Sequence, residues 1–125
     1  MRLSDNFVIL VVIISIFLMS APMLIHFYLF DRLLKFEYKN FKDQWLKDGS
    51  PNGYFWTSPN STFWNSTFRR TDFICEKWIF DKPKWIFESA KATDYYNSIR
   101  VSWITMYVSF VIGMTLIFVV VFGTR

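Results

Sequence analysis

Few side chains in this sequence have the types and spacing that chemistry requires. His26 is the only histidine and Cys75 the only cysteine among 125 residues. A single histidine cannot supply a second axial histidine to a haem, and a single cysteine forms neither an internal disulfide nor a cysteine-rich metal site. No phosphate loop, nucleophile elbow or zinc-protease motif occurs. We therefore predict that the protein is not an enzyme and holds no cofactor or metal.

Most of the chain's apolar residues lie in two long runs without charge, from Asn6 to Phe30 and from Val101 to Thr124. Each run exceeds the roughly 20 residues that an α-helix needs to cross the hydrocarbon core. Because backbone groups in lipid must be satisfied internally, each run is predicted to be a transmembrane helix. A cleaved signal peptide is the alternative for the first run. Its apolar part is longer than the usual roughly 7–15 residues, so we expect an uncleaved anchor.

The expected fold is an all-α membrane protein. Two transmembrane helices form a hairpin, joined by a cytoplasmic, aromatic-rich connection of short amphipathic helices. Residues 1–30 hold a short N-terminal tail and the first span, residues 31–100 the connection, and residues 101–125 the second span and a short C-terminal tail.

Basic residues near the span ends set the expected orientation. The connection carries most of them close to the spans: Arg32, Lys35, Lys39, Lys42 and Arg100. The outer tails carry only Arg2 and Arg125. The connection is therefore predicted to be cytoplasmic and both termini periplasmic, in a multi-pass protein.

Small and polar residues interrupt both apolar runs. Thr105, Ser109 and Gly113 recur every fourth residue, a spacing that lets helix backbones approach closely. In the first run the corresponding residues are Ser15, Pro22 and His26. We expect these six residues to pack the two helices of the hairpin together. Contact with another subunit, or an oligomeric pore, remains open, although the lack of intramembrane charge counts against a pore.

The start of the connection has a helical period. Leu34, Tyr38, Phe41 and Trp45 form one apolar stripe over residues 31–48. This stripe predicts one amphipathic helix that either prolongs the first span or lies on the membrane surface. Gly49 is expected to take the left-handed conformation that ends helices.

Six large aromatic residues then crowd into residues 48–68, which have no regular apolar period. Aromatic rings are favoured at the membrane interface, whereas a small aromatic core is the alternative. We predict a mixture of the two in which membrane contact prevails. The residues expected at the membrane surface are Trp45, Trp56, Trp64, Arg69, Arg70 and Trp78.

The tetrapeptide KWIF occurs twice, at 77–80 and 84–87. Pro83 separates the copies and predicts a second short helix, with Asp81 as its cap. Cys75, just before the first copy, is expected to be a buried structural thiol rather than a reactive one.

The segment WLKDGSPNGYFW, residues 45–56, resembles a turn found in small, uncharacterised two-span bacterial inner-membrane proteins. The layout is similar to that of universal stress protein B. This resemblance implies a bacterial inner-membrane location and a link to stress, and it implies no catalytic residues. We predict a non-enzymatic accessory or regulatory subunit. Its expected partners are the lipid bilayer and either a larger membrane complex or itself, but no nucleic acid, because the net charge is only +4.

Overall fold

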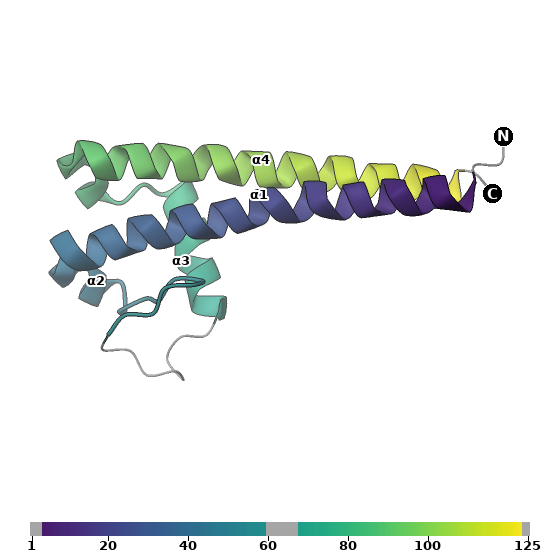
Figure 1. Cartoon of the computed structure of the whole chain (residues 1–125). Coiled ribbons are helices and arrows are strands. Elements are labelled where there is room, and N and C mark those ends of the chain that lie inside the picture. Colours follow the sequence, from purple (N-terminus) through teal and green to yellow (C-terminus); the bar gives the residue numbers. More distant parts are fainter. Residues whose placement is uncertain (1–3, 60–67, 124–125) are drawn as a thin grey trace. The chain divides into compact units, whose positions relative to one another are not determined.

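The computed structural model describes residues 4–59 and 68–123, and only the backbone of residues 68–73. Over these residues the chain forms helices and no strand, which confirms the all-α prediction. The elements are α1 (Asp5–Asn40), α2 (Lys42–Lys47), α3 (Phe68–Phe80), the 3₁₀ helix η2 (Lys84–Glu88) and α4 (Ala90–Phe122) (Figure 1).

The chain divides into two compact units. We call the first the helix pair (Met1–Ile25 with Ser102–Arg125) and the second the aromatic unit (His26–Val101). Helices α1 and α4 each contribute one part to each unit.

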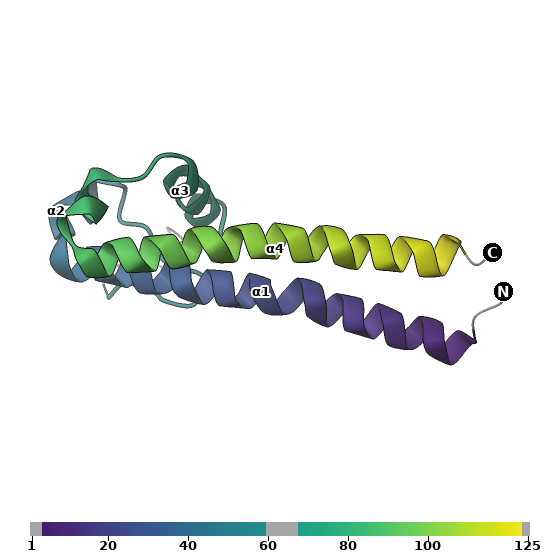
Figure 2. The ribbon, with the colours of Figure 1, turned by 90° about the horizontal axis from the view of Figure 1, so that it is seen from above.

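Within the helix pair, the two helices run side by side in opposite directions (Figures 1 and 2). Gly113 allows their close approach, because a Cβ at this position would lie 2.6 Å from Cγ of Met19 and 3.2 Å from the carbonyl oxygen of Ser15. Ser15 is fully buried and donates to the carbonyl of Val11 at 2.8 Å. Small residues thus fill the contact between these two helices.

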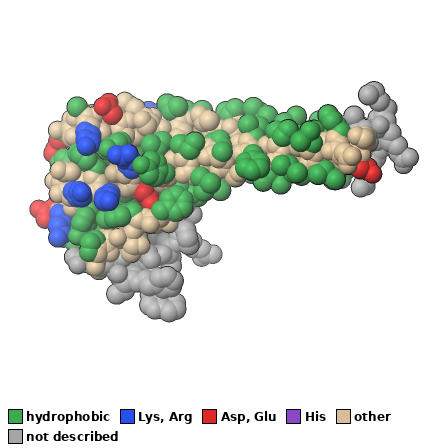
Figure 3. All heavy atoms as spheres, in the orientation of Figure 1, with side chains coloured by type: hydrophobic (Ala, Val, Ile, Leu, Met, Phe, Trp, Pro, Cys, Tyr) green, Lys and Arg blue, Asp and Glu red, His purple; other side chains and the backbone are tan. Residues whose placement is uncertain are grey.

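Both α1 and α4 are long enough and apolar enough to cross a membrane. In their most apolar stretches only 6% and 17% of the residues are buried within the chain, whereas the core helix of a soluble protein would be mostly buried. On the face seen in Figure 3, hydrophobic side chains cover the helix pair, whereas Lys and Arg side chains gather on the aromatic unit. The apolar surface of the helix pair therefore points outward.

The aromatic unit has a conventional core. Phe30 of α1 packs on Trp78 of α3 with ring centroids 5.5 Å apart, and Trp78 meets Trp85 of η2 edge to face at 5.7 Å. The two KWIF copies orient alike although one is α-helical and the other 3₁₀. In both, Trp and Ile are buried whereas Lys and Phe are exposed. The repeat therefore encodes two similar inward-facing pairs.

Two local expectations were wrong. Residues 31–40 continue the helix of the first apolar run, as one of the two alternatives predicted. Residues 31–48 do not form one helix, however, because Phe41 leaves the helical conformation (φ −134°, ψ 51°) between α1 and α2. This break lets α2 turn so that Trp45 packs edge-on against Tyr38, with ring centroids 4.9 Å apart. Asp81 does not cap the next helix. Its N–H instead bonds the Lys77 carbonyl at the end of α3, and η2 begins after Pro83 without a side-chain cap.

The end of α2 follows the prediction. Gly49 has φ 88°, the left-handed conformation expected of a glycine just after a helix. Its N–H bonds the carbonyl of Leu46 at 3.0 Å, and Ser50 N–H bonds that of Trp45 at 2.9 Å.

Candidate functional site: a basic, aromatic-walled pocket

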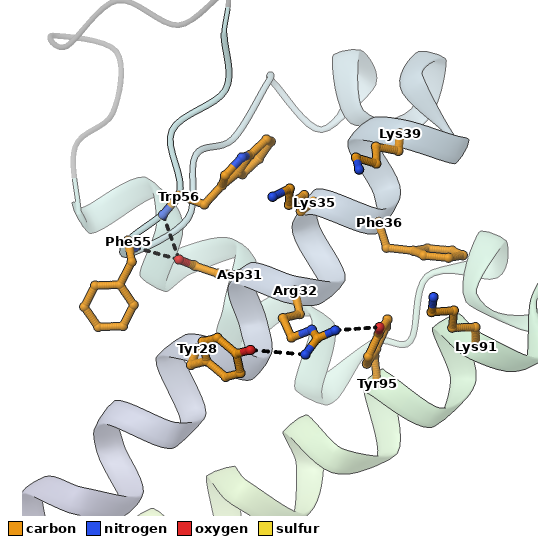
Figure 4. Close-up of a pocket in the computed structure, with 10 residues that line it drawn as sticks. All are labelled: Tyr28, Asp31, Arg32, Lys35, Phe36, Lys39, Phe55, Trp56, Lys91 and Tyr95. Carbon is orange, nitrogen blue, oxygen red and sulfur yellow. Dashed lines mark hydrogen bonds between the residues drawn. The ribbon is translucent and has the colours of Figure 1, made fainter.

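A pocket of about 540 Å³ lies in the aromatic unit (Figure 4). Five of its lining residues are aromatic, four are basic and one is acidic. They are Tyr28, Asp31, Arg32, Lys35, Phe36, Lys39, Phe55, Trp56, Lys91 and Tyr95.

The spacing of α1 places three of the four cations on one wall. Arg32, Lys35 and Lys39 follow one another at i, i+3 and i+7, so they lie on one face of the helix. Lys91 of α4 completes the set. Four basic side chains against one acidic side chain give the pocket a positive potential that favours anions.

Arg32 is held between two tyrosines, one from each long helix (Figure 4). Its guanidinium donates to the Tyr28 hydroxyl at 3.1 Å and to the Tyr95 hydroxyl at 3.4 Å. The hydrogen bond to Tyr28, with help from Tyr95, raises the pKa of Arg32 above its already high ordinary value. Because a guanidinium carries five N–H donors in a planar fork, Arg32 keeps donors for a carboxylate or phosphate ligand.

Asp31, the only acid among the described residues that line the pocket, is bound by the loop after α2. Its Oδ1 accepts the Tyr54 N–H at 2.6 Å, and its Oδ2 accepts the N–H groups of Phe55 and Trp56 at 2.6 and 2.8 Å. Burial raises the pKa of Asp31, and the three N–H donors oppose that shift. The carboxylate therefore anchors the loop and does not serve a ligand.

The loop comes this close to α1 only because position 53 is glycine. A Cβ on Gly53 would overlap the carboxyl group of Asp31. The loop also bonds itself, through Gly53 N–H to the Trp56 carbonyl at 2.8 Å and Ser58 N–H to Oδ1 of Asn52 at 2.8 Å. A backbone bound by its neighbours in this way is fixed without belonging to any helix.

The aromatic residues of this loop are used mainly within the chain. Tyr54 stacks on Phe27 with ring centroids 3.9 Å apart, and Trp56 lies 5.5 Å from Tyr38. Phe55 is the exception, since 64% of its side chain is exposed. Among the described aromatic residues of this loop, two of the three therefore dock it on α1.

The residues expected at the membrane surface differ in how exposed they are. Trp45 and Trp78 are only 2% and 4% exposed, and the Trp45 indole donates to the Pro51 carbonyl at 3.0 Å. These two side chains belong to the core. Trp56 is half-buried and lines the pocket. Trp64 and the side chains of Arg69 and Arg70 lie outside the described residues.

The residues expected to pack the two long helices together differ in burial and in the unit to which they belong. Ser15, Ser109 and Gly113 are buried in the helix pair, whereas Thr105 is exposed and Pro22 is half-buried within α1. His26 belongs instead to the aromatic unit, where it is buried.

His26 and Cys75 lie together in the interior of the aromatic unit. The imidazole Nε2 is 3.3 Å from Sγ of Cys75, and both residues are buried. This contact attaches α3 to α1 and agrees with a structural thiol. Within the described residues, no group of three His, Cys, Asp or Glu side chains could hold a metal ion.

A second acidic site, formed by Glu37 and Asp48, is not predicted by any pattern in the sequence. The Glu37 side chain is fully buried. If both carboxyl groups are ionised, neither oxygen of Glu37 nor the adjacent Oδ2 of Asp48 has a hydrogen-bond partner among the described residues. Burial, with a hydrogen bond to Asp48, raises the pKa of Glu37 to about 10. A proton on Glu37 supplies the donor that joins the two carboxyl groups. Glu37 is thus a neutral acid at pH 7.

Part of the basic pocket has a pattern that can be recognised in the sequence. Arg32, Lys35 and Lys39 stand out in the sequence at helical spacing, where they predict the orientation in the membrane. Neither the approach of Lys91 nor the bonds from Asp31 to residues 54–56 could be found from a local pattern, because each joins distant parts of the chain.

No family model matches the sequence, and neither a curated protein nor a solved structure matches it. The resemblance to universal stress protein B therefore stays a prediction.

Proposed function

We propose that this chain is a non-enzymatic two-span membrane protein whose aromatic unit binds a phosphate-bearing anion in the basic pocket. The observation that carries the proposal is the set of four cations around a pocket of about 540 Å³. Among the described lining residues there is one acid, Asp31, and it is already bound by three backbone N–H groups. Planar guanidinium and flexible ammonium groups together suit a phosphate.

The membrane placement has separate support. Both long helices expose apolar side chains that water would disfavour, and a bilayer would cover them. The basic residues of the pocket, with the positive-inside tendency, support an aromatic unit on the cytoplasmic side of a bacterial inner membrane and termini on the periplasmic side. In this setting the protein would serve as an accessory or regulatory subunit that responds to the bound anion, and a link to stress remains part of the proposal.

Binding is the direct test of the pocket. The full chain in detergent would be titrated with glycerol 3-phosphate and, separately, with a dispersed anionic phospholipid, with tryptophan fluorescence as the readout. We expect the double variant Lys35→Gln/Lys39→Gln to weaken binding about tenfold or more, since two charge-assisted contacts are lost. The matched control, Lys42→Gln/Lys47→Gln, removes the same charge outside the pocket. Equal loss in both pairs would mean that net charge, not the pocket, attracts the anion.

Topology is tested through an exposed position. Thr57→Cys in a Cys75→Ala background gives a single accessible thiol in the aromatic unit. A membrane-impermeant maleimide should label it in inside-out vesicles and not in intact cells. Labelling of intact cells would reverse the proposed orientation.

A further inference from the structure

We infer that the pocket takes a membrane-resident anionic phospholipid rather than a free phosphate, and that Phe55 and Tyr28 contact its glycerol and upper acyl region. This inference rests on the proposed function, because it names the source of the anion that the cations bind.

Along α1 the pocket lining begins with Tyr28, and the basic residues Arg32, Lys35 and Lys39 follow it, with Phe36 among them. Tyr28 lies about 3 Å before Phe30, the last residue of the charge-free run, by the helical rise of 1.5 Å per residue. By the same measure Arg32 lies about 3 Å and Lys35 about 7.5 Å beyond it. The headgroup layer of a bilayer is about 5–7 Å thick on each side of the hydrocarbon core. If Phe30 marks the edge of the hydrocarbon core, Arg32 thus falls within the headgroup layer and Lys35 at its outer edge, whereas Tyr28 lies about 3 Å inside the core.

Phe55 lines the same pocket and lies close to Phe27, which directly precedes Tyr28. Its ring centroid is 6.4 Å from that of Phe27, which precedes the end of the charge-free run by three residues. The ring is 64% exposed, and Tyr28 is 53% exposed. An exposed ring beside an apolar helix end is favoured in lipid and disfavoured in water.

The structure fixes Phe55 in this position instead of leaving it on a mobile loop. The Phe55 N–H and that of the next residue donate to Asp31, and the preceding Tyr54 stacks on Phe27. With the backbone and both neighbours turned inward, the Phe55 side chain is directed outward (Figure 4). A free phosphate would gain nothing from this ring, whereas a lipid would use both the ring and the cations.

Native mass spectrometry of the full chain released from detergent would test the inference with three probes: dioleoyl phosphatidylglycerol, dioleoyl phosphatidylcholine and glycerol 3-phosphate. The variant is Phe55→Ser, which keeps the backbone N–H bonds to Asp31. The control is Phe80→Ser, which removes a ring outside the pocket lining from a residue that is 77% exposed, somewhat more than Phe55.

We expect phosphatidylglycerol to bind at least tenfold more tightly than either other probe. Phe55→Ser should weaken phosphatidylglycerol about five- to tenfold, should leave glycerol 3-phosphate unchanged, and should differ from Phe80→Ser. If glycerol 3-phosphate competes equally and Phe55→Ser has no effect, the pocket binds phosphate and the lipid inference is overturned. If no probe depends on Lys35 and Lys39, the proposed function itself fails, and the inference fails with it.

Discussion

The helix pair and the aromatic unit satisfy their buried polar groups in opposite ways. In the helix pair, the buried Ser15 donates to the carbonyl of Val11, four residues earlier. In the aromatic unit, the Tyr96 hydroxyl donates to the Trp78 carbonyl, and Asp31 accepts from residues 54–56. Local bonds leave a helix free to present any face outward. Long-range bonds specify one tertiary arrangement, and they are the means by which the aromatic unit positions a pocket.

Removing the long-range anchor should have the largest effect. Asp31→Ala leaves three part-buried N–H groups without their acceptor, and we expect the aromatic unit to lose about 3 kcal/mol of stability. Thermal unfolding in detergent, followed by tryptophan fluorescence, measures this, because five of the six tryptophans lie between residues 26 and 101. Asp43→Ala on the exposed side of α2 is the control. Equal midpoints for the two variants would show that the anchor contributes little.

A glycine of the aromatic unit should tolerate alanine poorly. In Gly53→Ala the new methyl group overlaps the Asp31 carboxyl, which cannot move without breaking its bonds to the loop. We expect a loss of about 2–3 kcal/mol and faster proteolysis within residues 48–58. A wild-type proteolysis rate would contradict the close approach.

The buried carboxyl group of Glu37 should make the stability of the fold depend on pH. In Glu37→Gln a neutral amide replaces a carboxyl group whose pKa is raised from 4.5 to about 10. The folded wild type holds a proton that the unfolded chain releases above about pH 4.5, so its stability falls as pH rises from there toward about 10. The variant lacks this loss and should gain about 2 kcal/mol at pH 7.

The gain from Glu37→Gln should vanish near pH 4, where both the folded and the unfolded wild type are protonated. Midpoints of thermal unfolding at pH 4, 7 and 9 test the sign. A variant that is less stable than wild type at pH 7 and pH 9 would mean that Glu37 is ionised and paired.

The matching glycine of the helix pair should be more tolerant. In Gly113→Ala the new Cβ meets the flexible end of Met19 and lies 3.2 Å from the Ser15 carbonyl, which must yield slightly. We expect a loss of about 1 kcal/mol in a far-ultraviolet circular dichroism melt, well below that of Gly53→Ala. If Gly113→Ala lowers the stability as much as Gly53→Ala does, the two glycines do not differ in the way proposed.

Features that depend on neighbours along the chain could be predicted from the sequence. Two charge-free runs became long apolar helices, the small residues Ser109 and Gly113 lie buried in the helix pair, and Gly49 took its left-handed conformation after α2. Each of these follows from local periodicity or from backbone sterics.

Which polar and aromatic residues contact one another depends on how distant parts of the chain pack, and it could not be predicted from local patterns. Trp45 and Trp78 look like residues for a membrane surface, yet they fill the core, because the break at Phe41 and the docking of α3 bury them. Asp31 looks like the first charge after a span, yet it holds a loop more than 20 residues away. Burial and hydrogen bonding are properties of a residue's surroundings, and in this unit those surroundings come from distant parts of the chain.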